Sequence, residues 1–232
     1  GGGPRLALAL GFVMPVPARG ASDGAAPLPQ DPDELFRLSQ DYLKNLGPYK
    51  PLYFMLGAPL EESKFQLSFK YRFFNSAAPL TEKHPWVGGF HFGYTQTSFW
   101  DLASDSLPFE DTSYMPELFY LSRDTGWRPL GADAFLWQGG VHHESNGKSG
   151  EESRSTNTLY LAPIFVYYQP GSGRGLALIP RVKYYFDNSE SGNPDIEKYR
   201  GYVELDVIAG RTRGLVVRGN LRAASEGLSF QA

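Results

Sequence analysis

A histidine, a serine and an asparagine occupy two neighbouring segments of this chain in an order that suits nucleophilic catalysis. His143 and Ser145 are two residues apart, so a β-strand would direct both side chains to the same face. Asn157 follows twelve residues after Ser145. A serine hydroxyl, an imidazole base and an orienting amide form a hydrolytic site when the fold brings them together.

The residues on both sides of Gly150 predict a hairpin that would bring these groups together. Apolar residues of the same parity precede His143 and surround Asn157, namely Phe135, Trp137, Val141, Leu159, Leu161 and Phe165. A hairpin centred on Gly150 pairs residues whose numbers sum to 300, which sets His143 opposite Asn157 and Ser145 opposite Ser155. Directly opposed Cβ atoms lie about 4.5–5.5 Å apart, within reach of an imidazole–amide hydrogen bond.

In most of the chain after residue 50, apolar and polar residues alternate with a period of two, which predicts an all-β protein. The clearest segments are residues 51–57, 65–73, 89–95, 176–186, 203–207 and 215–222. One face of each is aliphatic or aromatic and the other is polar, which suits a soluble sandwich or a membrane barrel. Large aromatics near strand ends, long strands, and short turns alternating with long polar loops favour an antiparallel transmembrane β-barrel.

Composition excludes several other classes of protein. The chain has 232 residues, of which 41% are hydrophobic, 15% aromatic and 20% charged, and its mean hydropathy is -0.34. No stretch has the roughly 20 apolar residues of a transmembrane helix. The net charge of -3 does not indicate a nucleic-acid-binding protein. The absence of cysteine excludes disulfides and thiolate metal sites.

Three regions follow from the pattern. Residues 1–22 resemble a signal peptide, with Arg5 before an apolar run and a small-residue segment at 18–20. Residues 23–49 read as an N-terminal extension with a short helix that Asp33 caps, and residues 50–232 as the barrel. The alternation gives about nine strands, and the last residues read as part of another strand, so we expect the C-terminal strands of the barrel to be missing.

The hairpin resembles the signature of the outer membrane phospholipase A family. The similarity rests on three segments: residues 143–149 with 153–157, residues 94–114, and residues 193–202. It covers roughly residues 50–232 and implies a twelve-stranded barrel in the bacterial outer membrane, with its active site on the outer wall. It also implies a calcium cofactor, a phospholipid substrate and a homodimer.

The resemblance assigns the catalytic roles. Ser145 is implied as the nucleophile, His143 as the general base and Asn157 as the partner that orients the histidine. The amide of Gly147 is implied as an oxyanion donor. An aspartate in place of Asn157 would cost more to desolvate on a surface that faces lipid.

The resemblance also assigns the calcium and dimer contacts. The ligands carried over are the Ser153 hydroxyl, the Lys148 carbonyl and the Ser106 carbonyl of a second protomer, and Gln96 is carried over to the dimer interface. Calcium prefers several oxygen ligands from loops. Glu151 and Glu152 lie in the same loop, where a calcium role and a solvated acidic turn remain equally open.

The expected function is therefore a calcium-dependent phospholipase A1 or A2 that dimerisation activates. Two alternatives remain, a lipid A deacylase with a carboxylate as its third catalytic residue and a non-enzymatic pore or structural barrel. For a pore, charges on the inner face would line a channel; for a closed protein they would form a salt-bridged plug. The other histidines, His142, His91 and His84, are expected to have structural or exposed positions.

Overall fold

A computed structural model describes residues 31–34, 40–57, 60–187, 195–225 and 227–231. The predicted signal-like segment and residues 35–39 of the predicted helix lie outside these ranges. Residues 1–39 and 40–232 are separate units, and in the first of them residues 32–34 are helical. The second unit contains the β-sheet and all the site residues predicted above.

The second unit consists mostly of strands joined by short helices. In chain order the elements are η1 (Asp41–Asn45), β1 (Leu46–Pro48), β2 (Tyr53–Met55), η2 (Leu60–Glu62), β3 (Ser63–Arg72), α2 (Pro79–Lys83), η3 (Pro85–Gly89), β4 (Phe90–Trp100), β5 (Phe109–Leu121), η4 (Pro129–Gly131), β6 (Ala134–Ser145), η5 (Gly150–Glu152), β7 (Ser155–Gln169), β8 (Arg174–Phe186), α3 (Ile196–Arg200), β9 (Val203–Arg211), β10 (Val216–Ala224) and β11 (Gly227–Gln231).

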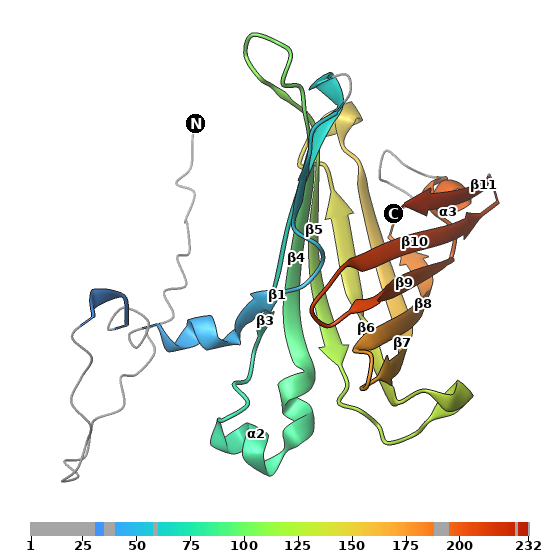
Figure 1. The fold of residues 1–232 in the computed structure, drawn as a ribbon. Helices are drawn as coiled ribbons and strands as arrows, with labels where there is room; N and C mark the ends of the chain where they lie inside the picture. Colours follow the sequence, from blue (N-terminus) through green and yellow to red (C-terminus); the bar gives the residue numbers. More distant parts are fainter. Residues whose placement is uncertain (1–30, 35–39, 58–59, 188–194, 226, 232) are drawn as a thin grey trace. The chain divides into compact units, whose positions relative to one another are not determined.

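These strands form one curled antiparallel sheet (Figure 1). Its order is β1-β3-β4-β5-β6-β7-β8-β9-β10-β11, with β2 also paired to β3. Within the described ranges β1 and β11 are the edges of this path, so that part of the sheet is an open half-barrel. Figure 1 places the connections after β4, β6 and β8 at one end, here called the loop end, and those after β3, β5, β7 and β9 at the other, the turn end.

The sheet is inside out compared with a soluble protein. Its inner face buries polar side chains, including Ser68, Thr95, Glu117, Gln138, Thr158, Glu204 and Asp206. Its outer face exposes large apolar side chains, including Leu67, Phe69, Leu159, Leu161, Val182 and Tyr184. The predicted alternation is confirmed, and an exposed apolar band over a polar interior is the pattern of a transmembrane barrel.

None of the helices in the described residues is both long and apolar enough to cross a bilayer.

A buried carboxylate organises the inner face. The side chain of Glu117, which is 2% exposed, accepts hydrogen bonds from the hydroxyls of Tyr49 (2.9 Å) and Tyr160, and from Gln138 Nε2 (3.3 Å). The Lys50 ammonium lies 3.8 Å from its second oxygen. A buried charge is tolerated only when it is paired and hydrogen-bonded in this way. The segment between β1 and β2 therefore fastens to the interior of the sheet.

A second group of charges surrounds Glu204. Its carboxylate lies 3.4 Å from Arg181 Nε and Lys183 Nζ and 3.3 Å from Arg222 Nε. Asp206 similarly pairs with Arg218 at 3.1 Å. Both buried carboxylates are therefore paired with basic side chains, which is the arrangement of a salt-bridged plug.

Two elements differ from the sequence prediction. The alternation did not reveal β5, because polar residues break its apolar face at Thr112 and Pro116 interrupts it further on. It also did not reveal β1, whose three residues pair with the end of β3. The described sheet therefore has eleven strands instead of about nine.

Candidate active site

The β6–β7 hairpin has the predicted register. His143 is the Cα partner of Asn157, and Ser145 is the partner of Ser155. The same pairing continues along the apolar outer face, where Val141 lies opposite Leu159. The histidine, the serine and the asparagine therefore share the lipid-facing surface of adjacent strands, close to the loop end.

A hydrogen bond joins the histidine to the asparagine. His143 Nδ1 lies 2.7 Å from Asn157 Oδ1. The other side of the amide is fixed too, because Asn157 Nδ2 donates to the carbonyl of Asp187 at 3.4 Å. Since Oδ1 can only accept, Nδ1 carries a proton, and in the neutral imidazole the lone pair is then on Nε2. This tautomer is the one that a general base for serine requires.

Ser145 lies on the same face as His143, two residues along β6. Within the described residues, no hydrogen bond joins Ser145 Oγ to His143. Hydrogen bonds of this kind often form only when substrate is bound. The shared face of the two residues and the orientation of the His143 ring are present in the protein without substrate.

Asn157→Ala should lower turnover by roughly 10- to 100-fold, or about 1.4 to 2.7 kcal/mol, without abolishing it. The reason is that Asn157 orients the ring of His143 but transfers no proton. Steady-state hydrolysis of a soluble acyl ester would measure the change, with kcat and KM separated. An unchanged kcat would show that Asn157 does not contribute to turnover.

The loop between β6 and β7 is built around the side chain of Asn146. Its Oδ1 accepts hydrogen bonds from the amides of Lys148 (3.3 Å) and Arg154 (3.0 Å), and its Nδ2 donates to the Glu152 carbonyl at 2.8 Å. The Asn146 amide in turn donates to the Arg154 carbonyl at 3.0 Å. One side chain thus holds both arms of the loop that carries Lys148 and Ser153.

Gly147 is held in a conformation that only glycine adopts easily. Its φ is 69°, in the left-handed region. A Cβ at this position would also lie 2.9 Å from Cε2 of Tyr114, which is the Cα partner of Ser145 on β5. Both constraints explain a glycine directly after the Ser145–Asn146 pair.

Glu152 is the acidic residue of this loop whose side chain the structure describes. Glu152 forms an ion pair with Lys148 at 2.8 Å, and this ammonium lowers the pKa of Glu152 by hydrogen bonding and by its charge. Both side chains are exposed, so Glu152 behaves as part of a solvated turn. No group of three or more acidic or histidine side chains suited to a metal ion occurs in the described residues. A site made from hydroxyl and carbonyl oxygens would not be of that type.

Ser106 lies in the β4–β5 connection (residues 101–108), which is at the loop end with the β6–β7 loop (Figure 1). Asp101 organises this connection by accepting hydrogen bonds from the amides of Ala103 (2.8 Å) and Ser104 (3.0 Å). Ser104 in turn accepts from the amide of Leu107 at 3.0 Å. Ser106 is exposed at the edge of this compact turn.

Gln96 belongs to a polar row on the outer face of β4. Tyr94 donates its hydroxyl proton to Gln96 Oε1 (3.1 Å), and Gln96 Nε2 donates to Ser98 Oγ (3.2 Å). Thr112 on β5 extends the row through a hydrogen bond to Ser98 Oγ at 3.0 Å. We call these four residues the polar row. Such a row is unusual on a surface that is otherwise apolar.

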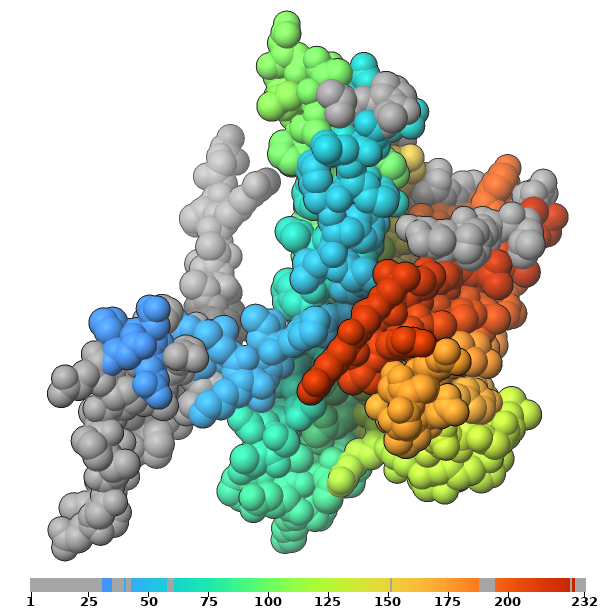
Figure 2. All heavy atoms as spheres, in the orientation of Figure 1, coloured from blue at the N-terminus to red at the C-terminus, as the bar shows by residue number. Residues whose placement is uncertain are grey.

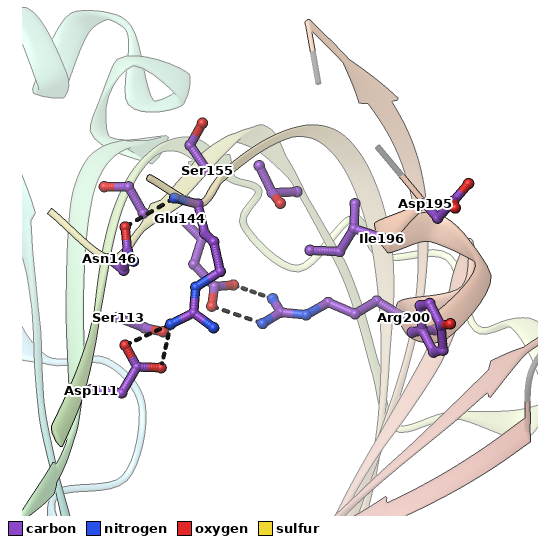
Figure 3. A pocket seen from close by; sticks show the side chains of 12 residues that line it. Asp111, Ser113, Glu144, Asn146, Ser155, Asp195, Ile196 and Arg200 are labelled. Carbon is purple, nitrogen blue, oxygen red and sulfur yellow. Dashed lines mark hydrogen bonds and ion pairs between the residues drawn. The ribbon is translucent and has the colours of Figure 1, made fainter. Parts of the chain in front are cut away.

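The inner side of β6 carries an ion pair that the sequence analysis did not predict. Glu144, between the histidine and the serine, points inward and binds Arg200 of α3 through both oxygens, one of them at 2.9 Å (Figure 3). Arg154 likewise binds both oxygens of Asp111 at 3.0 Å. These pairs line a cavity of about 400 Å³ behind Ser145. Both join segments far apart in sequence, so no local spacing could reveal them.

The remaining histidines lie where they were expected. His142 faces inward, opposite Glu117. His91 is buried on the inner face, with its Nδ1 2.8 Å from the Gly89 carbonyl and its ring stacked on Phe119. His84 is exposed. None of the three shares the face of Ser145.

Comparison with known proteins gives a consistent family. A family profile described as phospholipase A1 matches residues 39–230. The phospholipase A1 of Salmonella typhimurium is 34% identical over 149 residues, which are 63% of this chain and 47% of that protein. The phospholipase A1 of Escherichia coli K12 is 33% identical over the same shares. The chain therefore spans about half the length of these curated relatives, 47%.

Solved structures give the same result. Outer membrane phospholipase A from Escherichia coli matches with a TM-score of 0.53 at 27% identity, over 73% of this chain and 62% of that one. A calcium-bound dimer of the Salmonella typhi outer membrane phospholipase matches with a TM-score of 0.53 at 27% identity, over 71% and 59%. An active-site mutant of the Escherichia coli protein, with asparagine replaced by alanine, matches with a TM-score of 0.54 at 28% identity, over 71% and 59%.

Proposed function

The chain belongs to the phospholipase A1 family, and from this premise we propose that it hydrolyses acyl esters of glycerophospholipids in the bacterial outer membrane, with calcium, as a homodimer. The observation that carries the proposal is the hydrogen bond between His143 and Asn157 on the lipid-facing surface, two residues from Ser145. A hydrolytic site placed on the outer wall meets its substrate laterally, in the bilayer.

The proposed mechanism uses an acyl-serine intermediate. His143 Nε2 takes the proton of Ser145 Oγ while this oxygen attacks the ester carbonyl carbon. The tetrahedral intermediate collapses, and the lysophospholipid leaves with the proton from the imidazolium. Water, deprotonated by the same base, then attacks the acyl-serine and releases the fatty acid. The Gly147 amide is the proposed donor to the oxyanion, and a donor of this type contributes about 3–4 kcal/mol.

Oxygen atoms suited to calcium are available in the loops. The Lys148 carbonyl, the Ser153 hydroxyl and the Ser106 carbonyl have no hydrogen-bond donor among the described residues. Hard oxygen ligands without partners are what this ion requires, so the residues fit it. Bound there, calcium would supply positive charge next to the developing oxyanion. The first two ligands come from the loop that Asn146 holds together.

Asn146→Ala should raise the calcium concentration for half-maximal activity about 10- to 100-fold, as loss of an outer-shell partner typically does. The variant keeps both proposed ligands of that loop but loses the hydrogen bonds that position them. Calcium titration followed by calorimetry and by ester hydrolysis would measure this. Asn75→Ala is the matched control, because Asn75 holds a similar turn through the Ala77 amide (2.9 Å) at the other end of the sheet. Equal calcium requirements in both variants would contradict the assignment.

The polar row supports a contact between two copies of the chain. Polar groups on a lipid-facing surface stabilise association when they exchange local hydrogen bonds for bonds across the interface. In the proposed dimer, Gln96 lies in this contact and Ser106 of one protomer completes the calcium site of its partner. Calcium would then favour the dimer, because one protomer alone offers only part of the ligands.

Gln96→Ala should weaken the dimer several-fold while leaving the turnover of the remaining dimers unchanged. Crosslinking in micelles over a range of protein concentrations, with activity measured on the same samples, would separate the two effects. Gln169→Ala removes a glutamine from the outer face at the turn end and should leave dimerisation unchanged. A dimer population that does not depend on calcium, while activity does, would disprove the link between calcium binding and dimerisation.

The two alternative functions have less support. A lipid A deacylase would have a carboxylate as its third residue, whereas the side chain hydrogen-bonded to His143 in this chain is the amide of Asn157. A pore has less support because the interior carboxylates Glu117, Glu204 and Asp206 are each paired with basic side chains and are not free to line a channel. Conductance in planar bilayers would separate a pore from the enzyme.

A further inference from the structure

Two arginines face each other across neighbouring strands at the turn end. Arg174, the first residue of β8, is the Cα partner of Arg211, the last residue of β9. Like charges placed directly opposite each other are destabilising. Arg213 follows in the adjoining turn, and all three side chains are exposed. In the described part of the chain, no carboxylate lies within ion-pair distance of any of them. The positive charge of this cluster is uncompensated.

Both arginines belong to the lipid-facing surface. Arg174 has the parity of Leu176 and Leu178, and Arg211 has the parity of Ala209 and Val207, which are their partners across the strands. Successive residues on one face of a strand are about 7 Å apart along it. The two guanidinium groups therefore follow directly after the last apolar pair of the outer face.

Hydrogen bonds between two turns hold the arginines in place. The Thr212 amide and hydroxyl donate to the Gly173 carbonyl at 3.0 and 3.1 Å, which joins the β9–β10 turn to the β7–β8 turn. The Tyr168 hydroxyl lies 3.3 Å from Thr212 Oγ1. Figure 2 shows the two turns, orange and red, next to each other. These bonds and the strand pairing keep the backbones of the two arginines side by side.

Aromatic residues place this level at the edge of the membrane. At the turn end Trp127 packs on Phe135 (5.3 Å between ring centroids), and Phe135 packs on Phe165 (5.2 Å). Phe165 has the same outward parity as Tyr167, the Cα partner of Leu176. Aromatic belts of this kind mark the boundary between hydrocarbon and headgroups. The arginine pair lies at or just beyond this boundary.

We propose that Arg174 and Arg211 bind the phosphate of an anionic glycerophospholipid in the leaflet opposite the catalytic site. Guanidinium groups bind phosphate oxygens through paired hydrogen bonds, and one phosphodiester would neutralise the repulsion between the two arginines. The occupant is a membrane lipid because the pair lies on the outer wall, continuous with the apolar band that contacts its acyl chains. This site does not depend on ester hydrolysis.

The test uses the full-length protein with Ser145→Ala, so that the probe lipids are not cleaved, in calcium-free phosphatidylcholine bilayers. Electron spin resonance of spin-labelled phosphatidylglycerol and phosphatidylcholine gives the preference of the protein for the anionic lipid. We expect a preference of several-fold, which falls to nearly one in Arg174→Gln/Arg211→Gln. The matched control, Lys83→Gln/Arg123→Gln, removes two exposed charges from other connections at the same end and should keep the preference.

A second measurement covers effects on folding. The Arg174→Gln/Arg211→Gln variant should unfold at a higher temperature than its parent in zwitterionic micelles, because the repulsion is gone, and should lose the stabilisation that anionic micelles give the parent. Equal lipid preference in the parent and the double variant would overturn the proposal, and so would no preference in the parent. Displacement of the labelled lipid by inorganic phosphate at matched ionic strength would assign the arginines to a free anion instead.

Discussion

Ser145→Ala should abolish phospholipid hydrolysis, with a loss of turnover on the order of 10⁴- to 10⁶-fold, and should abolish covalent labelling by a sulfonyl fluoride. The acyl-enzyme cannot form without the hydroxyl, and the remaining oxyanion donor and bound substrate give little rate by themselves. Mass spectrometry of the labelled protein would locate the modified residue. The heat-dependent mobility of the barrel on gels would show that the variant is folded.

Ser155→Ala is the matched control for this experiment. Ser155 is the Cα partner of Ser145 and has the same parity on β7, so its hydroxyl is a neighbouring serine hydroxyl on the same face. We expect this variant to keep its labelling and most of its turnover. Labelling that survives Ser145→Ala and disappears in Ser155→Ala would transfer the nucleophile to the neighbouring strand.

His143→Ala should lower turnover by about 10³-fold or more, whereas His142→Ala should keep it within a few-fold of the unchanged protein. General base catalysis contributes about 10²- to 10⁴-fold. Only His143 shares the outer face with Ser145 and is oriented by Asn157. His142 lies on the inner face opposite Glu117, so its loss should change the stability of the barrel and not the chemistry.

The two adjacent histidines make this comparison unusually direct. They have the same side chain and neighbouring positions on β6, and they differ in the face to which they belong. Turnover at saturating substrate and the unfolding temperature should be measured for both variants. Equal losses of turnover at equal stability would contradict the argument from strand parity.

Much of this architecture could be predicted from the sequence, because alternation is a local signal. The hairpin around Gly150 gave the register of His143 and Asn157, and the apolar parity gave the outer face. The β5 strand was not predicted, because Thr112 belongs to the polar row and breaks the apolar pattern. A local rule of this kind fails where polar residues interrupt the apolar face.

The supporting contacts of the site could not be predicted, because they depend on distant segments. The ion pair between Glu144 and Arg200 joins β6 to α3, 56 residues away. Asn146 is different, since its hydrogen bonds stay within its own loop. An asparagine directly before a glycine that needs positive φ is a turn signal, and it could have been read as the centre of the loop.

The most direct test of the proposed function is fatty acid release from phosphatidylcholine in mixed micelles by the full-length protein, measured with calcium and with a chelator. We expect release with calcium, loss of release with the chelator, and full recovery when calcium is restored. Release that is equal in both conditions would contradict the role of calcium. No release in either condition, from protein that is folded and dimeric, would contradict the assignment of Ser145, His143 and Asn157 as a phospholipase site.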